Sequence, residues 1–139
     1  GRFIDLTPDL VRGTQGVAVN VFGRERHFGT LLNIANDYER QAAEREAINF
    51  FIQSAAASIT GRTIINIDRM LQGFGIREDT VCLVNTVHDS VAYEVRDSHV
   101  EWFMNAMSAV AERPYPELNN ASFKLDMGVG ENWVDAECG

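Results

Sequence analysis

The amino-acid sequence predicts an α+β fold, in which an antiparallel sheet is combined with helices. Two apolar runs rich in β-branched residues, "VCLVNTV" and "VAYEV", lie on either side of a short polar stretch and indicate a β-hairpin. A long segment of helix-forming residues precedes this hairpin, and an amphipathic segment follows it. With 139 residues, 45% of them hydrophobic, the chain can bury one ordinary core.

Charge and cysteine content exclude several classes of protein. A formal net charge of -8 argues against a free-standing nucleic-acid-binding module, because neutralising phosphates requires a basic surface. Cys82 and Cys138 are far apart, with no CxxC motif, so neither a disulfide framework nor a zinc site is indicated. No apolar run reaches the length of a membrane span. We therefore expect a soluble chain with no membrane partner in a reducing, cytoplasmic compartment.

The first part of the chain shows one short strand. Residues 1–16 contain Pro and Gly and no sustained period, so we expect a poorly defined lead-in. Residues 17–22, "VAVNVF", alternate as a strand does. Gly23 ends this strand, and we expect the charged residues after it to form a loop.

A long helix comes next. Asn36 and Glu39 have the spacing of a helix N-terminus, and good helix formers follow as far as Gly61, where we expect the helix to end. Residues 62–72 are again helical in pattern and stop before two glycines. A kinked pair of helices and one bent helix both fit this pattern.

Three further elements complete the predicted fold. The hairpin has strands at 80–87 and 91–95. Ser98 and Glu101 have the spacing of a capping box for an amphipathic helix that ends before Pro114. Residues 123–129, "FKLDMGV", alternate as a final strand.

A row of polar side chains lies along one face of the long predicted helix. Its members follow one another at intervals of four residues: Gln41, Arg45, Asn49 and Gln53. The row can simply be the solvated face of an amphipathic helix. Solvated faces tend to carry Lys and Glu, however, whereas Arg, Asn and Gln are donors suited to the acceptors of a duplex minor groove.

The tip of the predicted hairpin carries the most unusual residues. Asp89 follows His88 at a point where a turn would hold its carboxylate away from the sheet, as a ligand of Mg²⁺ beside substrate phosphates must be held. An ordinary polar turn is the alternative, because Asp accepts turn conformations. A metal phosphohydrolase site would need further ligands, and His27 and His99 lie in unrelated contexts.

Several of these stretches together resemble family A DNA polymerases of the bacterial DNA polymerase I type and their phage relatives. "AEREAINFFIQSAAASI", "VHDSVAYEV" and "GVGENW" occur in the order and spacing of the C-terminus of that family. "VFGRERHF" is similar to the segment that leads out of the fingers, so the resemblance runs from about Val17 to the end. Each motif is modest by itself, and the set is specific.

The resemblance implies a right-hand polymerase fold, with the hairpin as motif C of an antiparallel palm sheet. Asp89 would be one of two catalytic aspartates that hold a pair of Mg²⁺ ions about 3.5 to 4 Å apart. His88 would lie near the primer terminus, as a primer-positioning residue that also contacts DNA.

The same resemblance assigns the remaining segments. Arg45, Asn49 and Gln53 would contact the minor groove of primer-template DNA, with Gln41 in the same row. Residues 17–60 would connect the fingers to the palm and carry this helix, and residues 61–139 would form the palm with a C-terminal strand. The arginines near the first strand are possible phosphate contacts, although exposed arginines are common there: Arg24 and Arg26.

The sequence departs from the family pattern in three places. Ser90 stands where the family usually has Glu, so a metal contact is weakened or passes through water. "FFIQSAAAS" lacks the family's usual Pro and Gly-Thr-Ala-Ala-Asp residues. A motif A strand with the other aspartate, and a fingers helix that holds the deoxynucleoside triphosphate, are not found.

Two functions remain open at this point. The chain is either the C-terminal part of a DNA-directed DNA polymerase, inactive without an N-terminal polymerase chain or domain, or a non-catalytic remnant or interaction module that keeps some duplex binding. In the first case the acidic charge is explained, because the basic fingers and thumb lie elsewhere.

Overall fold

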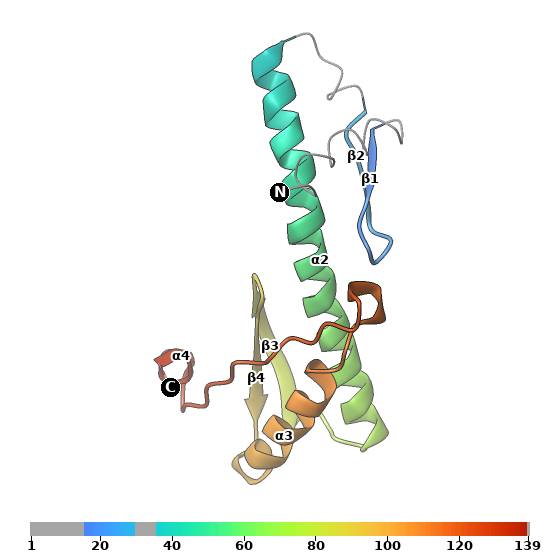
Figure 1. Ribbon diagram of the computed structural model, residues 1–139. Coiled ribbons are helices and arrows are strands. Elements are labelled where there is room, and N and C mark those ends of the chain that lie inside the picture. The colour runs from blue at the N-terminus through green and yellow to red at the C-terminus, as the bar shows by residue number, and fades with distance from the viewer. Residues whose placement is uncertain (1–15, 30–35, 139) are drawn as a thin grey trace. The chain divides into compact units, whose positions relative to one another are not determined.

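The chain folds as two compact units, Gly1–Gly61 and Arg62–Gly139. The computed structural model describes residues 16–29 and 36–138, so most of the predicted lead-in lies outside the described residues. Figure 1 shows the elements of both units, which are helices and two antiparallel hairpins. The predicted α+β fold is confirmed.

Helix α2 (Asp37–Gly73) is continuous over 37 residues. Asn36 starts it as predicted, because its Oδ1 accepts a hydrogen bond from the Tyr38 N–H at 3.0 Å. The predicted end at Gly61 is wrong, because one helical element runs through it where a kinked pair of helices or one bent helix was predicted. Glycine in a helix costs only about 1 kcal/mol, which packing of the helix-forming residues on both sides offsets.

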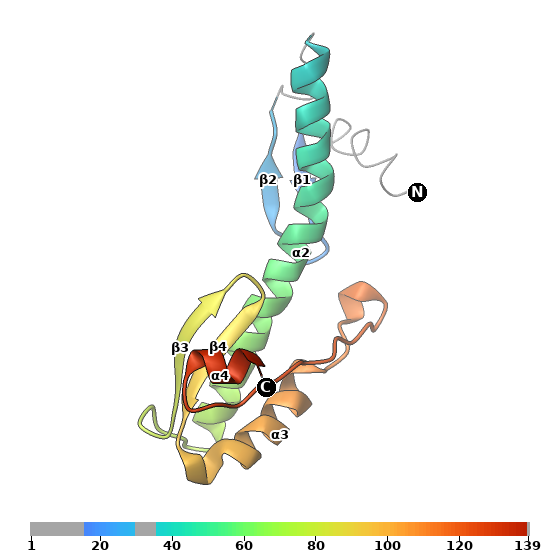
Figure 2. The same ribbon diagram turned by 90° about the vertical axis from the view of Figure 1, so that its left-hand side faces the viewer.

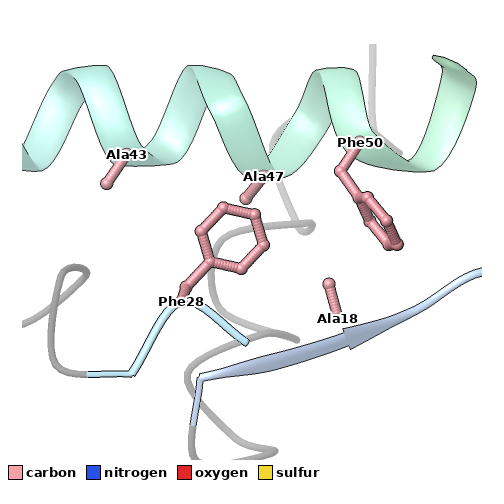
Figure 3. Packing of buried hydrophobic residues seen from close by; sticks show 5 residues of the cluster. All are labelled: Ala18, Phe28, Ala43, Ala47 and Phe50. Atoms are coloured by element: carbon pink, nitrogen blue, oxygen red, sulfur yellow. The ribbon is translucent and has the colours of Figure 1, made fainter. Parts of the chain in front are cut away.

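In the first unit, β1 (Val17–Val19) pairs antiparallel with β2 (Glu25–His27). The predicted first strand is therefore shorter than expected, and the predicted loop after it contains a strand. All three β2 side chains are exposed and polar or charged, so no apolar alternation marked them as a strand. Figure 3 shows how this hairpin packs on α2 through small and aromatic side chains, namely Ala18, Phe28, Ala43, Ala47 and Phe50.

In the second unit, the predicted central hairpin is confirmed as β3 (Val81–Val87) and β4 (Ser90–Val95). A short 3-10 helix η2 (Asp97–His99) leads into α3 (Val100–Ala111). Figure 2 shows α3 beside the hairpin and the second half of α2. Their shared core is formed by Ile67, Leu71, Val81, Phe103 and Val110.

The predicted capping box of α3 is wrong. The residue that caps α3 is His99, and its side chain makes no capping hydrogen bond. The Ser98 hydroxyl instead lies 2.9 Å from the His99 Nδ1. The preceding turn is a 3-10 helix, which moves Ser98 away from the capping position.

The predicted final strand at 123–129 is also wrong. This segment forms no strand, and it lies between the 3-10 helix η3 (Pro116–Leu118) and helix α4 (Trp133–Cys138). Alternation alone does not make a strand, because the backbone needs a partner for its hydrogen bonds. In the described part of the chain, the helices are too short or too polar to cross a membrane.

Candidate functional site

A two-residue turn holds the residues at the tip of the second hairpin. The pairing of β3 with β4 continues to Val87 and Ser90, which leaves His88 and Asp89 as the turn. His88 has a φ of 54°, in the left-handed region. Tight hairpins need such positive φ values, and His accepts them more readily than most residues other than glycine. The chain therefore forms a tight turn without the usual Asn-Gly, and keeps a histidine and a carboxylate at its tip.

Asp89 is fully available to a ligand. His88, Asp89 and Ser90 are all exposed. Within residues 16–29 and 36–138, no hydrogen bond or ion pair reaches the Asp89 carboxylate. A carboxylate held this way on the end of a rigid hairpin is a hard oxygen ligand that pays no cost in broken contacts when it binds a cation.

The donor set fits a metal site only in part. Among the described residues, no group of three or more His, Cys, Asp or Glu side chains could hold a metal ion. Mg²⁺ in nucleotidyl-transfer sites is held by one or two carboxylates together with phosphates and water. The chemistry of Asp89 fits one such carboxylate ligand.

The base of the hairpin is fixed by aromatic packing. The ring of Tyr93 on β4 lies 5.0 Å from that of Phe103 on α3, in an edge-to-face arrangement. Burial and, to a smaller extent, the nearby Asp68 carboxylate together raise the pKa of Tyr93 to about 12. Val81 and Val95 face each other in the register and belong to the same apolar cluster. The base of the hairpin that carries the turn is therefore anchored in the apolar core of the second unit.

The four residues of the predicted polar row are all exposed on α2. The side chains of Gln41, Arg45, Asn49 and Gln53 have no hydrogen-bond partner within the described part of the chain. The buried positions of α2 within the first unit are Ala43, Ala47, Phe50 and Ser54. At about 100° per residue, these buried positions lie roughly on the opposite side of the helix from the row. The row is therefore free to donate to a ligand.

The two sets of predicted residues belong to different units. The polar row lies in Gly1–Gly61, and the hairpin turn lies in Arg62–Gly139. Each unit holds its own set rigidly, the first on a helix and the second on a paired hairpin.

The two predicted phosphate contacts differ. Arg26 forms an ion pair with Glu46, and its guanidinium lies 5.3 Å from the centre of the Phe28 ring. Arg24 is exposed at the turn between β1 and β2, and the described residues offer its side chain no partner. Arg24 is thus the better placed of the two for a phosphate.

Sequence reasoning missed Asn20, which ties the first hairpin to α2. Its side chain is 5% exposed, and its Oδ1 accepts hydrogen bonds from the backbone N–H groups of Phe22 and Arg24, both at 2.9 Å. Its Nδ2 donates to the hydroxyl of Ser54 at 3.0 Å. Asn20 lies two residues after the buried Ala18, so in an extended chain both side chains point to the same face. This two-residue spacing was the signal available in the sequence.

Comparison with known proteins gives one consistent result. The family model described as DNA polymerase family A matches residues 2–135. DNA polymerase I of Chloroflexus aurantiacus is 33% identical over 95% of this chain and 13% of that protein. DNA polymerase I of Pseudomonas aeruginosa is 32% identical over 88% of this chain and 13% of that protein.

A solved structure shows the same similarity. It is the POL domain of Pol1 from M. smegmatis in complex with DNA primer-template and dNTP. The TM-score is 0.86 at 26% identity, over 98% of this chain and 23% of that chain. The chain thus spans about an eighth of the length of the curated relatives it matches.

Proposed function

Because the chain belongs to DNA polymerase family A, we propose that it forms the C-terminal palm portion of a DNA-directed DNA polymerase. It works with an N-terminal polymerase part, which supplies the motif A aspartate and the fingers helix. The observation that carries this proposal is the two-residue turn that presents an exposed Asp89 beside His88. Its substrates are primer-template DNA and deoxynucleoside triphosphates, as in the complex of the similar M. smegmatis domain.

The chemistry proposed is nucleotidyl transfer with Mg²⁺. When bound, a pair of such ions lowers the pKa of the primer 3′ hydroxyl and neutralises charge on the triphosphate. Asp89 contributes one carboxylate ligand to this pair. His88, held by its left-handed backbone at the first position of the turn, orients the primer terminus.

The polar row is proposed to hold the duplex. Arg45, Asn49 and Gln53 donate to acceptors of the minor groove, which are similar for all base pairs, so the contact suits any sequence. Gln41 extends the row by one turn, and Arg24 adds a phosphate contact. Because these residues sit on one helix, their spacing does not change when the duplex binds.

The test is to measure primer extension before and after the chain is joined to an N-terminal polymerase part. The chain alone, with primer-template, deoxynucleoside triphosphates and Mg²⁺, should extend no primer. Joined to an N-terminal polymerase part that carries motif A and the fingers, it should extend the primer, and Asp89→Ala should abolish this activity while duplex binding persists.

Two results would contradict the proposal. Extension by the unaccompanied chain would show that it is not an incomplete portion. A completed protein that binds duplex but never extends it would favour the alternative, a non-catalytic remnant or interaction module. The observation that favours a non-catalytic chain is Ser90, which stands where the family usually has Glu.

A further inference from the structure

The side chain of Asn20 uses every one of its hydrogen-bonding positions. Its Oδ1 accepts from the N–H groups of Phe22 and Arg24, both at 2.9 Å. Its Nδ2 donates to the Ser54 hydroxyl at 3.0 Å and to the Ser58 hydroxyl at 3.4 Å. An asparagine amide has an acceptor oxygen with two lone pairs and a nitrogen with two hydrogens, so all of them are engaged. The backbone N–H groups also fix which end of the amide faces the turn, because only the oxygen can accept from them.

The two serine hydroxyls on α2 are arranged to receive this amide. The Ser58 hydroxyl donates to the Ser54 carbonyl at 2.8 Å, so its lone pairs are left to accept from Asn20. Asn20 and Ser54 are 5% and 7% exposed. A buried amide with these partners is held in one place, because water cannot replace its hydrogen bonds. Both serines lie in the stretch "SAAAS", in which this chain departs from the family pattern.

Asn20 also closes the turn between β1 and β2. The Asn20 N–H donates to the Arg24 carbonyl at 2.9 Å, and the Gly23 N–H donates to the Asn20 carbonyl at 2.9 Å. These bonds and the two that reach Oδ1 shape residues 20–24. Figures 1 and 2 both show this turn beside α2. The backbone of Arg24 is therefore fixed by Asn20, whereas the Arg24 side chain is exposed.

Through these contacts, Asn20 connects the two kinds of residue that are proposed to hold the duplex. One hydrogen bond joins its side chain to the Arg24 backbone, and another joins it to Ser54. Ser54 directly follows Gln53, which belongs to the polar row on α2. A duplex presents its phosphates and its groove acceptors at set separations. A phosphate contact and a groove contact therefore act together only when the protein holds their donors at a matching separation.

We propose that Asn20 is a positioning residue for duplex binding. Through Ser54 it holds the turn of residues 20–24 against α2, so that Arg24 reaches a phosphate of the same duplex whose minor groove Gln53 contacts. This inference rests on the proposed function for the duplex and for the roles of Arg24 and Gln53. Without the Asn20 side chain, the hydrogen bonds that connect the Arg24 backbone to Ser54 are lost, and Arg24 samples positions away from the phosphate.

A purely structural role for Asn20 has a different signature in binding measurements. Loss of stability alone lowers the duplex affinity by the same factor at every salt concentration, because the number of cations that meet the duplex is unchanged. Loss of a phosphate contact releases fewer counterions, so the slope of log K against log salt becomes shallower. The salt dependence therefore separates positioning from stability.

The experiment measures binding of the full chain to a labelled duplex by fluorescence anisotropy at several salt concentrations. The unmodified chain, Arg24→Gln, Asn20→Ala and the double variant form a cycle. In the unmodified chain, Arg24→Gln should make the slope shallower by about one unit. Asn20→Ala should do the same, and each should weaken binding by about three- to tenfold at low salt. In the Asn20→Ala background, Arg24→Gln should change the slope by less than about 0.3.

Two further variants control for stability. Ser54→Ala removes the acceptor on α2 but leaves the Oδ1 bonds inside the turn, so it should reduce the effect of Arg24→Gln on the slope by about half. Ala47→Gly weakens the packing of the same hairpin on α2 and has no hydrogen-bonding side chain, so it should leave that effect at about one unit. Denaturant unfolding shows whether each variant is folded under the binding conditions.

The outcomes that reject this role differ from those that reject the proposed duplex contacts. Equal slope changes from Arg24→Gln with and without Asn20 would overturn the inference and leave the phosphate contact standing. An effect of Arg24→Gln that also disappears in Ala47→Gly would overturn it, because lost stability would then be the cause. If Asn20→Ala does not fold, Ser54→Ala decides by the same criterion. An unmodified chain that binds no duplex, or in which Arg24→Gln leaves the slope unchanged, would reject the proposed phosphate contact and the inference with it.

Discussion

At the scale of single residues, the proposed roles divide between chemistry and binding. Asp89 stands at an exposed tip with no contact to lose, and the row on α2 stands on a helix face with no partner in the described part of the chain. Substitution at either place should leave the fold intact, so changes in activity can be interpreted directly.

The first prediction contrasts the two places in the completed polymerase. Asn49→Ala or Gln53→Ala should raise the KM for duplex by about two- to tenfold with little change in kcat, since each removes one or two hydrogen bonds of about 0.5–1.5 kcal/mol. Asp89→Asn should lower kcat by about a hundredfold or more, since a metal ligand acts on the transition state. Steady-state extension kinetics give both constants. Small and equal changes of kcat and KM in all three variants would contradict the assignment of Asp89 to catalysis and of Asn49 and Gln53 to duplex binding.

The second prediction concerns Ser90, which faces Val87 at the end of the hairpin ladder and follows Asp89. Ser90→Glu adds a carboxylate beside the proposed metal ligand, so the Mg²⁺ concentration for half-maximal extension should fall by about two- to tenfold. Ser90→Gln is the matched control, because it has the same length without the charge. A metal requirement that is the same in both variants would place Ser90 outside the metal site.

At the scale of elements, hairpins and helices are joined by a few specific contacts. The third prediction is that Asn20→Ala lowers the stability by about 1–3 kcal/mol, because two backbone N–H groups lose their buried acceptor. Denaturant unfolding measures the change. Ser58→Ala is the comparison, since its hydroxyl lies 3.4 Å from the Asn20 Nδ2 and should cost less. Equal losses of unfolding free energy in the two variants would mean that the hydrogen bonds from the Phe22 and Arg24 N–H groups to Asn20 contribute little to stability.

The fourth prediction concerns the support of the β3–β4 hairpin at alkaline pH. Folding raises the pKa of Tyr93 from 10.0 to about 12, because burial disfavours the phenolate. This raised pKa stabilises the folded state fully below pH 10, and the contribution is lost as the pH rises toward 12. Unfolding curves over this range should fall less steeply for Tyr93→Phe than for the unmodified chain. Tyr38→Phe, at a position 76% exposed, is the matched control.

At the scale of the whole molecule, charge limits how the chain alone can hold DNA. With 20 acidic and 12 basic residues, it has few cations to spare for phosphates. Arg26 is already paired with Glu46, which leaves Arg24 and Arg45 among the residues assigned to DNA. On the proposed function, the completed polymerase takes most of its electrostatic attraction for DNA from its N-terminal part.

The fifth prediction follows from this count. The duplex affinity of the chain alone should fall with salt with a slope no steeper than about -2 in log K against log salt, because about two cations displace counterions from the duplex: Arg24 at a phosphate and Arg45 in the minor groove. Fluorescence anisotropy with labelled duplex at several salt concentrations measures the slope. Arg45→Gln should make the slope shallower by about one unit, and Arg69→Gln, at an exposed position of α2 outside the row, should leave it unchanged. A slope of about -6 would require a phosphate-binding surface different from the one proposed.

The sequence by itself determined the family, the long helix, the central hairpin and the positions of the candidate residues. These are local properties: a helix start at Asn36, an alternation on each side of His88 and Asp89, and a four-residue spacing from Gln41 to Gln53. Each can be recognised from neighbouring residues without knowing what they pack against.

Only the tertiary structure decided which patterned segments find partners. Gly61 does not end α2, because the residues on both sides of it stay in the helix and pack there. The charged residues after Gly23 form β2, because β1 offers them a backbone to pair with. Residues 123–129 alternate like a strand and form none, because a strand exists only where another backbone completes its hydrogen bonds, and no described residue does so here.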